Sequence, residues 1–169
     1  MLDEAGVLAR ADELAGLLTD AVEHGASIGF VLPLTAAEVR DYWNGVAVQI
    51  AAGGKVLCVA LDEPGSVIGA AQLGLEWRAN GRHRAEVQKV MVRPAARGRG
   101  IGAALMRRIE DEARRRGRTL LFLDTSVGAS GAVEFYTRLG WIPAGSIPDY
   151  AADPDGTLVP NAIFYKRLA

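Results

Sequence analysis

A glycine-rich turn between an apolar run and a helical run constrains the fold of this chain more than any other segment. The apolar run Val87–Val92 ends at Arg93-Pro94, and the turn Arg97-Gly-Arg-Gly-Ile-Gly102 leads into Ala103-Ala-Leu-Met106. Glycines let a ligand approach the backbone closely, and the first N–H groups of a helix favour an anion. The segment therefore predicts a phosphate-binding loop at a strand-to-helix junction.

The rest of the chain alternates between helical and extended patterns. Apolar residues recur at helical spacing over 4–23, and a capping box at Thr35 starts a second helix that stops at Gly53-Gly54. The further expected elements are strands over 27–32, 56–61, 67–77, 85–92, 120–123 and 163–168, and helices over 100–116 and 132–139. The prolines of the tail from 141 onward are expected in loops. The order predicts one mixed α/β domain with an antiparallel meander and one crossover unit.

Composition limits the classes of function. A chain of 169 residues with 50% apolar and 23% charged residues fits one globular domain, taken as 1–169. The net charge of -1 provides no global attraction to nucleic acid or to an anionic membrane. No apolar run reaches the ~18 residues of a membrane span. Cys58 is the single cysteine, which excludes an intrachain disulfide and predicts a cytoplasmic protein with a buried structural thiol.

Two familiar kinds of phosphate loop do not fit this turn. A nucleoside-triphosphate loop needs Gly-Lys-Ser/Thr, where this chain has Ile101-Gly102-Ala103. A dinucleotide loop needs G-x-G-x-x-G/A, which Gly98, Gly100 and Ala103 satisfy formally. However, five residues separate the turn from its strand, and that strand ends an antiparallel meander. The chain also leaves no room for a second βαβ half.

A third kind of loop does fit. Arg97-x-x-Gly100-x-Gly102 matches the Q/R-x-x-G-x-G/A signature that binds coenzyme A in the GCN5-related N-acetyltransferase (GNAT) superfamily, and Ala132-Val-Glu-Phe-Tyr-Thr-Arg-Leu-Gly-Trp141 is similar to a second segment of that superfamily. More narrowly, the chain resembles tabtoxin-resistance-type small-molecule acetyltransferases in Gly25–Phe30, His83–Lys89 and Pro154–Thr157. The resemblance implies a single-domain, mostly antiparallel sheet with splayed central strands and flanking helices. It also implies acetyl transfer from acetyl-CoA to an amine, without a metal.

The resemblance also implies how acetyl-CoA binds. The amides of Gly98, Arg99, Gly100, Ile101, Gly102 and Ala103 would hold the pyrophosphate, and the guanidinium groups of Arg97 and Arg99 can reach phosphate oxygens. The backbone of Val90 and Val92 would pair with the pantetheine arm as an added strand does, because residues two apart present backbone groups on the same side.

Acetyl transfer to an amine requires a base and benefits from an acid. A lysine-like amine has a pKa near ~10.4 and is mostly protonated at pH 7. Tyr136 matches the superfamily's general acid for the leaving thiolate, with a core tyrosine as the alternative. Glu86 and Asp124, at the ends of two neighbouring strands, are the expected bases. Their alternatives are an edge-strand charge and a strand-end hydrogen-bonding residue.

The histidines have no predicted role, whereas two aromatic residues are candidates for the acceptor pocket. His24 and His83 are expected at the surface, and neither forms a metal site with Cys58. Trp43 and Phe30 are candidates for lining the acceptor pocket.

The expected acceptor is a small-molecule amine such as an amino-acid-like toxin, antibiotic or metabolite. A protein N-terminus or lysine is an alternative acceptor, and a non-catalytic acyl-CoA-binding regulatory domain is an alternative function. The apolar last strand is a candidate surface for a homodimer.

Overall fold

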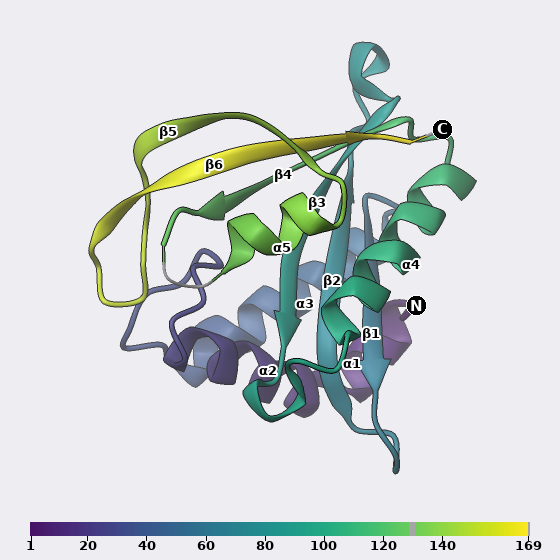
Figure 1. Ribbon diagram of the computed structural model, residues 1–169. Coiled ribbons are helices and arrows are strands. Elements are labelled where there is room, and N and C mark those ends of the chain that lie inside the picture. Colours follow the sequence, from purple (N-terminus) through teal and green to yellow (C-terminus); the bar gives the residue numbers. More distant parts are fainter. Residues whose placement is uncertain (129–130, 169) are drawn as a thin grey trace.

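Six strands form one sheet in the computed structural model, which describes residues 1–128 and 131–168 (Figure 1). The spatial order of the strands is β1-β2-β3-β4-β6-β5. The elements in chain order are α1 (Glu4–Ala9), α2 (Ala11–Glu23), α3 (Ala36–Ala51), β1 (Lys55–Leu61), β2 (Val67–Leu75), β3 (Arg84–Val92), α4 (Ile101–Arg115), β4 (Leu120–Ser126), α5 (Ala132–Arg138), β5 (Ile142–Ala152) and β6 (Leu158–Arg167).

The first predicted helix is divided in two. Arg10 leaves helical geometry with φ -114° and ψ 21°, so α1 and α2 meet there. Its guanidinium donates to Glu13 Oε1 and to the carbonyl of Gly65, and Glu13 Oε2 accepts from the N–H of Val67. These contacts tie the break to the β1–β2 turn. The capping box of α3 is confirmed, because Thr35 and Glu38 exchange both hydrogen bonds.

The strand predicted over 27–32 is wrong. The segment is an irregular loop in which Gly25 and Gly29 have φ of 82° and 83°. These left-handed residues interrupt an extended chain, and Phe30 packs against the core of the three N-terminal helices instead. The N–H of Leu32 donates to the carbonyl of Pro154 at 2.8 Å. The loop 24–35 therefore reaches the β5–β6 hairpin.

The predicted meander and the splay of the central strands are confirmed. β1, β2 and β3 pair antiparallel in sequence order. β3 and β4 are parallel, but only Arg84–Glu86 of β3 faces Leu120–Phe122 of β4. Beyond Glu86, β3 pairs with β2 alone, while β4 stays paired with β6 along its whole length. The two central strands therefore separate after their first three residues (Figure 1).

The tail contains a strand, β5, that was not predicted because its prolines indicated loops. β5 pairs antiparallel with β6 and forms an edge of the sheet, with register shifts after Pro143 and after Ile147. Proline is tolerated on an edge strand, where its missing N–H interrupts no ladder. β6 begins at Leu158, five residues earlier than predicted, and lies between β4 and β5. The last strand therefore has no free edge, and the exposed apolar residues Ile142 and Ile147 lie on β5.

Two apolar cores cover the two faces of the sheet. One core joins the sheet to α4 and α5 and includes Met106, Ile109 and Phe164. The other joins the sheet to α1, α2 and α3 and includes Leu18 and Trp43. The helix predicted over 100–116 is confirmed as α4, which packs into the first core. Both cores hold β3 in place, and β3 carries Glu86, Val90 and Val92 of the candidate site.

Candidate active site

The predicted phosphate loop follows β3 through a short 3₁₀ turn at Pro94–Ala96. Gly98 and Gly100 have φ of 74° and 76°, and a Cβ added at either would meet no atom within 4 Å. The two glycines are therefore needed for their left-handed backbone and not for packing. Residues 97–100 are exposed to solvent.

The backbone N–H groups of this loop have no hydrogen-bond partner among the described residues. Across residues 1–128 and 131–168, no hydrogen bond uses the N–H of residues 98–103, and Gly100 provides no side-chain cap for α4. Six backbone donors at the positive end of a 15-residue helix are thus available to an anion. Arg97 donates through Nε to the carbonyl of Val92 at 3.2 Å, and Arg99 is exposed. These residues fit a pyrophosphate.

Gly102 serves a different purpose. A Cβ at this position would lie 3.2 Å from Cζ and 3.4 Å from Cε2 of Phe135. Glycine therefore lets the first turn of α4 pack closely on α5, whereas a Cβ would require the Phe135 ring to shift by a few tenths of an ångström. This contact links the phosphate loop to the helix that carries Tyr136.

The open edge of β3 lies next to this loop. Val90 and Val92 both pack against the core under α4 and α5. Because β3 leaves β4 after Glu86, the backbone groups of the following residues on that side have no strand to pair with. An extended ligand can pair with them as an added strand does.

Tyr136 is the buried group of the site. Its residue is 8% exposed, and its ring meets those of Phe135, Trp141 and Phe164 at centroid distances of 5.1, 6.1 and 6.0 Å. Burial raises the pKa of the Tyr136 phenol, and the negative charge of Asp124 raises it further. The phenol therefore keeps its proton throughout the neutral range and can act only as a donor of that proton.

The two carboxylates lie where the central strands separate. Glu86 is the last residue of β3 that faces β4, opposite Phe122, and Asp124 follows two residues later on β4. Asn161 Nδ2 donates to Asp124 Oδ2 at 2.6 Å, and Gln88 Nε2 donates to Glu86 Oε2 at 2.8 Å. Asp124 is exposed and Glu86 is half-buried. The structure thus places both carboxylates at the point where β3 and β4 begin to separate.

A hydrogen-bonded network that the sequence analysis missed supports Glu86. Lys55 Nζ donates to Gln88 Oε1 at 2.9 Å and to Gln72 Oε1 at 3.0 Å, and Tyr42 hydrogen-bonds to Gln72. Because an ammonium can only donate, Lys55 forces the Gln88 oxygen to accept, and this turns the Gln88 NH₂ toward Glu86. The signal in the sequence is the polar Gln72 and Gln88 within apolar strands.

The two histidines and the single cysteine lie outside the splay. His24 and His83 are exposed, as predicted, and Cys58 is a buried free thiol whose pKa is raised by burial. In the described ranges, no cluster of three or more His, Cys, Asp or Glu side chains is placed to hold a metal ion. No helix in the same ranges is long and apolar enough to cross a membrane.

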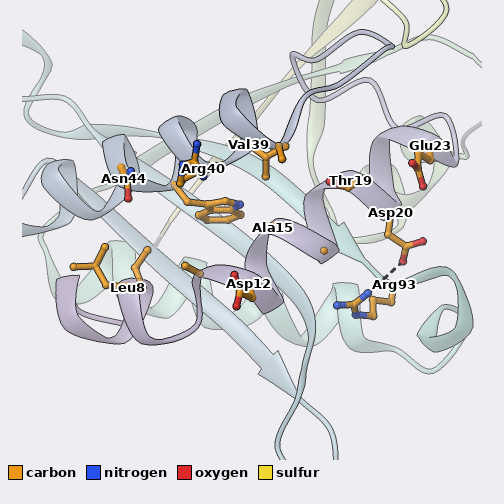
Figure 2. Close-up of a pocket in the computed structure, with 15 residues that line it drawn as sticks. Leu8, Asp12, Ala15, Thr19, Asp20, Glu23, Val39, Arg40, Asn44 and Arg93 are labelled. Atoms are coloured by element: carbon orange, nitrogen blue, oxygen red, sulfur yellow. Dashed lines mark ion pairs between the residues drawn. The ribbon is translucent and has the colours of Figure 1, made fainter.

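A cavity of about 530 Å³ lies away from the splay, among α1, α2 and α3 (Figure 2). Trp43 lines this cavity, together with acidic residues of α2 and Arg93, which pairs with Asp20 at 3.7 Å. Phe30 does not line it and instead packs edge-on against Tyr42 at 5.2 Å. The Trp43 ring also lies 5.2 Å from that of Tyr42, so both aromatic candidates for the acceptor pocket contact the residue that hydrogen-bonds to Gln72.

Comparison with known proteins shows the family to which the chain belongs. The model of the acetyltransferase (GNAT) family matches residues 15–141. The chain belongs to the acetyltransferase (GNAT) family. It is 34% identical over 90 residues to an IAA acetyltransferase from Azospirillum brasilense, a match that covers 53% of this chain and 57% of that protein.

Two further similarities extend over more of the chain. An L-methionine sulfoximine/L-methionine sulfone acetyltransferase from Pseudomonas paraeruginosa is 29% identical over 140 residues, which covers 80% of this chain and 78% of that protein. The crystal structure of a GNAT superfamily phosphinothricin acetyltransferase from Sinorhizobium meliloti, in complex with AcCoA, has a TM-score of 0.78 at 22% identity. That match covers 95% of this chain and 84% of that protein, and it confirms the fold.

Proposed function

We propose that this protein is an N-acetyltransferase that moves an acetyl group from acetyl-CoA to the amine of a small molecule. One observation carries the proposal: the splay between β3 and β4 has an unpartnered N–H loop at one end, and two carboxylates and a protonated phenol near the other. The co-substrate would bind with its pyrophosphate at residues 98–103. Its pantetheine arm would lie along Val90 and Val92. The catalytic domain is taken as residues 1–169.

The chemistry follows from the groups at the splay. Glu86 or Asp124 accepts a proton from the acceptor ammonium, directly or through water, which frees the nitrogen lone pair. The amine nitrogen then attacks the thioester carbonyl, so a C–N bond forms and the C–S bond breaks. As the C–S bond breaks, Tyr136 donates its phenolic proton to the leaving sulfur. The nitrogen, now bonded to the acetyl group, gives up its second proton through water, and this proton returns the phenol to its neutral form. The carboxylate releases the first proton to solvent. No covalent enzyme intermediate is needed.

The names of relatives support a small acceptor. An L-methionine sulfoximine/L-methionine sulfone acetyltransferase and a phosphinothricin acetyltransferase both act, by name, on small molecules. A protein N-terminus or lysine is the alternative acceptor. A non-catalytic acyl-CoA-binding domain is the other alternative, and Tyr136 with both carboxylates argues against it. We expect a cytoplasmic protein and a homodimer formed through β5, where the exposed apolar residues of the sheet edge lie.

The test is a thiol-release assay with acetyl-CoA and a panel of amines. The panel contains amino acids, amino-acid analogues, aminoglycosides and short peptides with free N-termini or lysines. Turnover confined to small amines supports the proposal. Turnover confined to peptides supports the protein acceptor, and acetyl-CoA binding without turnover across the panel supports the regulatory domain.

A further inference from the structure

Lys89 lies at an irregularity of β3 that no glycine explains. Its φ is 51°, a left-handed conformation that residues with a Cβ rarely adopt. The register of β2 and β3 shows the reason. Gln72 faces Gln88 and Ala70 faces Met91, so Lys89 and Val90 together oppose one residue of β2. Lys89 is therefore the first residue of a β-bulge.

The bulge changes the face to which the lysine points. Regular alternation would place Lys89 on the side of Val87, which packs into the core under α4 and α5. Instead Val90 packs against that core, and the Nζ of Lys89 lies 6.0 Å from the centre of the Tyr42 ring on α3. The same Nζ would lie 3.3 Å from a Cβ added at Gly29. The ammonium thus sits between β3, α3 and the loop 24–35.

Lys89 feels the charge of two carboxylates, but neither of them forms an ion pair with its ammonium. Burial lowers the pKa of its ammonium, while Asp124 and then Glu86 raise it, so both carboxylates act on this group. Yet within the described residues its Nζ makes no hydrogen bond and no ion pair within 4.0 Å. A half-buried cation without a hydrogen-bonding partner is costly unless an anion joins it. The glycine at position 29 leaves room beside it.

We propose that Lys89 Nζ binds a carboxylate of the acceptor, while Glu86 and Asp124 receive its amine. The acceptor would then be a small zwitterion that carries an amine and a carboxylate on one molecule. This assignment rests on the proposed acetyltransferase function. It makes Lys89 a specificity-determining residue, because an amine without the anionic group would leave the ammonium unpaired.

The test compares amines that differ only in the anionic group. Each amino acid that supports thiol release is paired with its carboxamide, and both are measured on the wild type, Lys89→Met and Lys89→Arg. Methionine keeps the length of the side chain and removes its charge, while arginine restores the charge. Arg40→Met is the matched control, because it removes an exposed cation of α3 that lines the separate cavity shown in Figure 2.

The wild type should prefer the carboxylate over the carboxamide by about 10- to 100-fold in kcat/KM, the range typical of a hydrogen bond to a charged group. Lys89→Met should abolish this preference through KM and leave the KM of acetyl-CoA unchanged. Lys89→Arg should restore part of the preference, and Arg40→Met should keep all of it. An equal loss of kcat for both members of each pair would instead indicate that Lys89 acts on Glu86 and Asp124, and would overturn the proposal.

The failures of the two proposals can be separated. Turnover of amines without any preference for the carboxylate would refute the role assigned to Lys89 but not the acetyltransferase function. Should no amine be acetylated, the panel would be titrated calorimetrically into wild type and Lys89→Met in the presence of coenzyme A. Binding of amino acids that Lys89→Met weakens at least ~10-fold would support the anion site. Binding that Lys89→Met leaves unchanged, or no binding, would overturn it.

Discussion

Replacing Tyr136 with phenylalanine should reduce turnover without harming the fold. The substitution removes one hydroxyl and keeps the ring that contacts Phe135, Trp141 and Phe164. Because burial and the charge of Asp124 raise the pKa of this phenol, its proton is present at every neutral pH. Tyr136→Phe therefore removes an acid that is fully protonated under assay conditions.

The size of the loss follows from the role of the acid. A thiolate leaving group has a pKa near ~8.5, and a positioned general acid contributes about 10²–10⁴ to the rate. The expected fall in kcat is therefore about 10²–10⁴-fold, or roughly 2.7–5.4 kcal/mol at 1.36 kcal/mol for each factor of ten. The KM for acetyl-CoA should change by less than about threefold, since the pyrophosphate loop is untouched.

The assay is thiol release at saturating acetyl-CoA, with thermal unfolding measured on the same preparations. Tyr150→Phe is the matched control, because Tyr150 is 49% exposed on β5 and lies on no element of the site. An unchanged kcat for Tyr136→Phe would refute the acid role and leave Tyr136 as a core residue. A similar loss in Tyr150→Phe would show that the effect does not depend on the site.

Three further results are expected. Gly100→Ala forces a Cβ into a backbone with φ of 76°, so it should cost about 1–2 kcal/mol at the loop and raise the KM for acetyl-CoA more than it lowers kcat, as steady-state kinetics can test. Burial raises the pKa of Tyr42 to about 12, so between pH 10 and 12 the unfolded chain loses a proton that the folded one keeps, and stability falls as pH rises. Urea unfolding should show this fall reduced in Tyr42→Phe by up to about 2.7 kcal/mol at the upper end of that range, whereas an identical pH dependence in the two proteins would contradict it. Ile147→Lys places a charge in the exposed apolar edge of β5 and should convert a dimer to a monomer in light scattering; a wild type that is already monomeric would remove β5 as an interface.

Local signals in the sequence were enough to predict most of the fold. The Thr35 capping box starts α3 as predicted, and the three successive strands expected over 56–61, 67–77 and 85–92 form the predicted meander. The failures have physical causes. Arg10 breaks the first helix because its side chain and that of Glu13 bond to the β1–β2 turn, a contact that lies far away in sequence. β5 was hidden because prolines are tolerated on an edge strand.

In the candidate site, too, residues in local motifs could be predicted, whereas contacts between distant segments could not. The phosphate loop and Tyr136 belong to short motifs with characteristic residues, so the sequence alone was enough to propose them as site residues. The support of Glu86 through Gln88 and Lys55 depends on the register of three strands, which no motif contains. The face to which Lys89 points depends on a β-bulge that forms without glycine. The one sign of this bulge in the sequence is a lysine within an apolar strand.

The most direct measurement follows the acetyl group itself. The protein is incubated with acetyl-CoA labelled in the acetyl carbons and with the panel of small amines, and the products are identified by mass spectrometry. A small amine should carry the labelled acetyl group on its nitrogen, formed in step with free coenzyme A, and this product should be lost when Glu86→Gln and Asp124→Asn are combined. Label found only on protein, or no transfer to any amine, would contradict it.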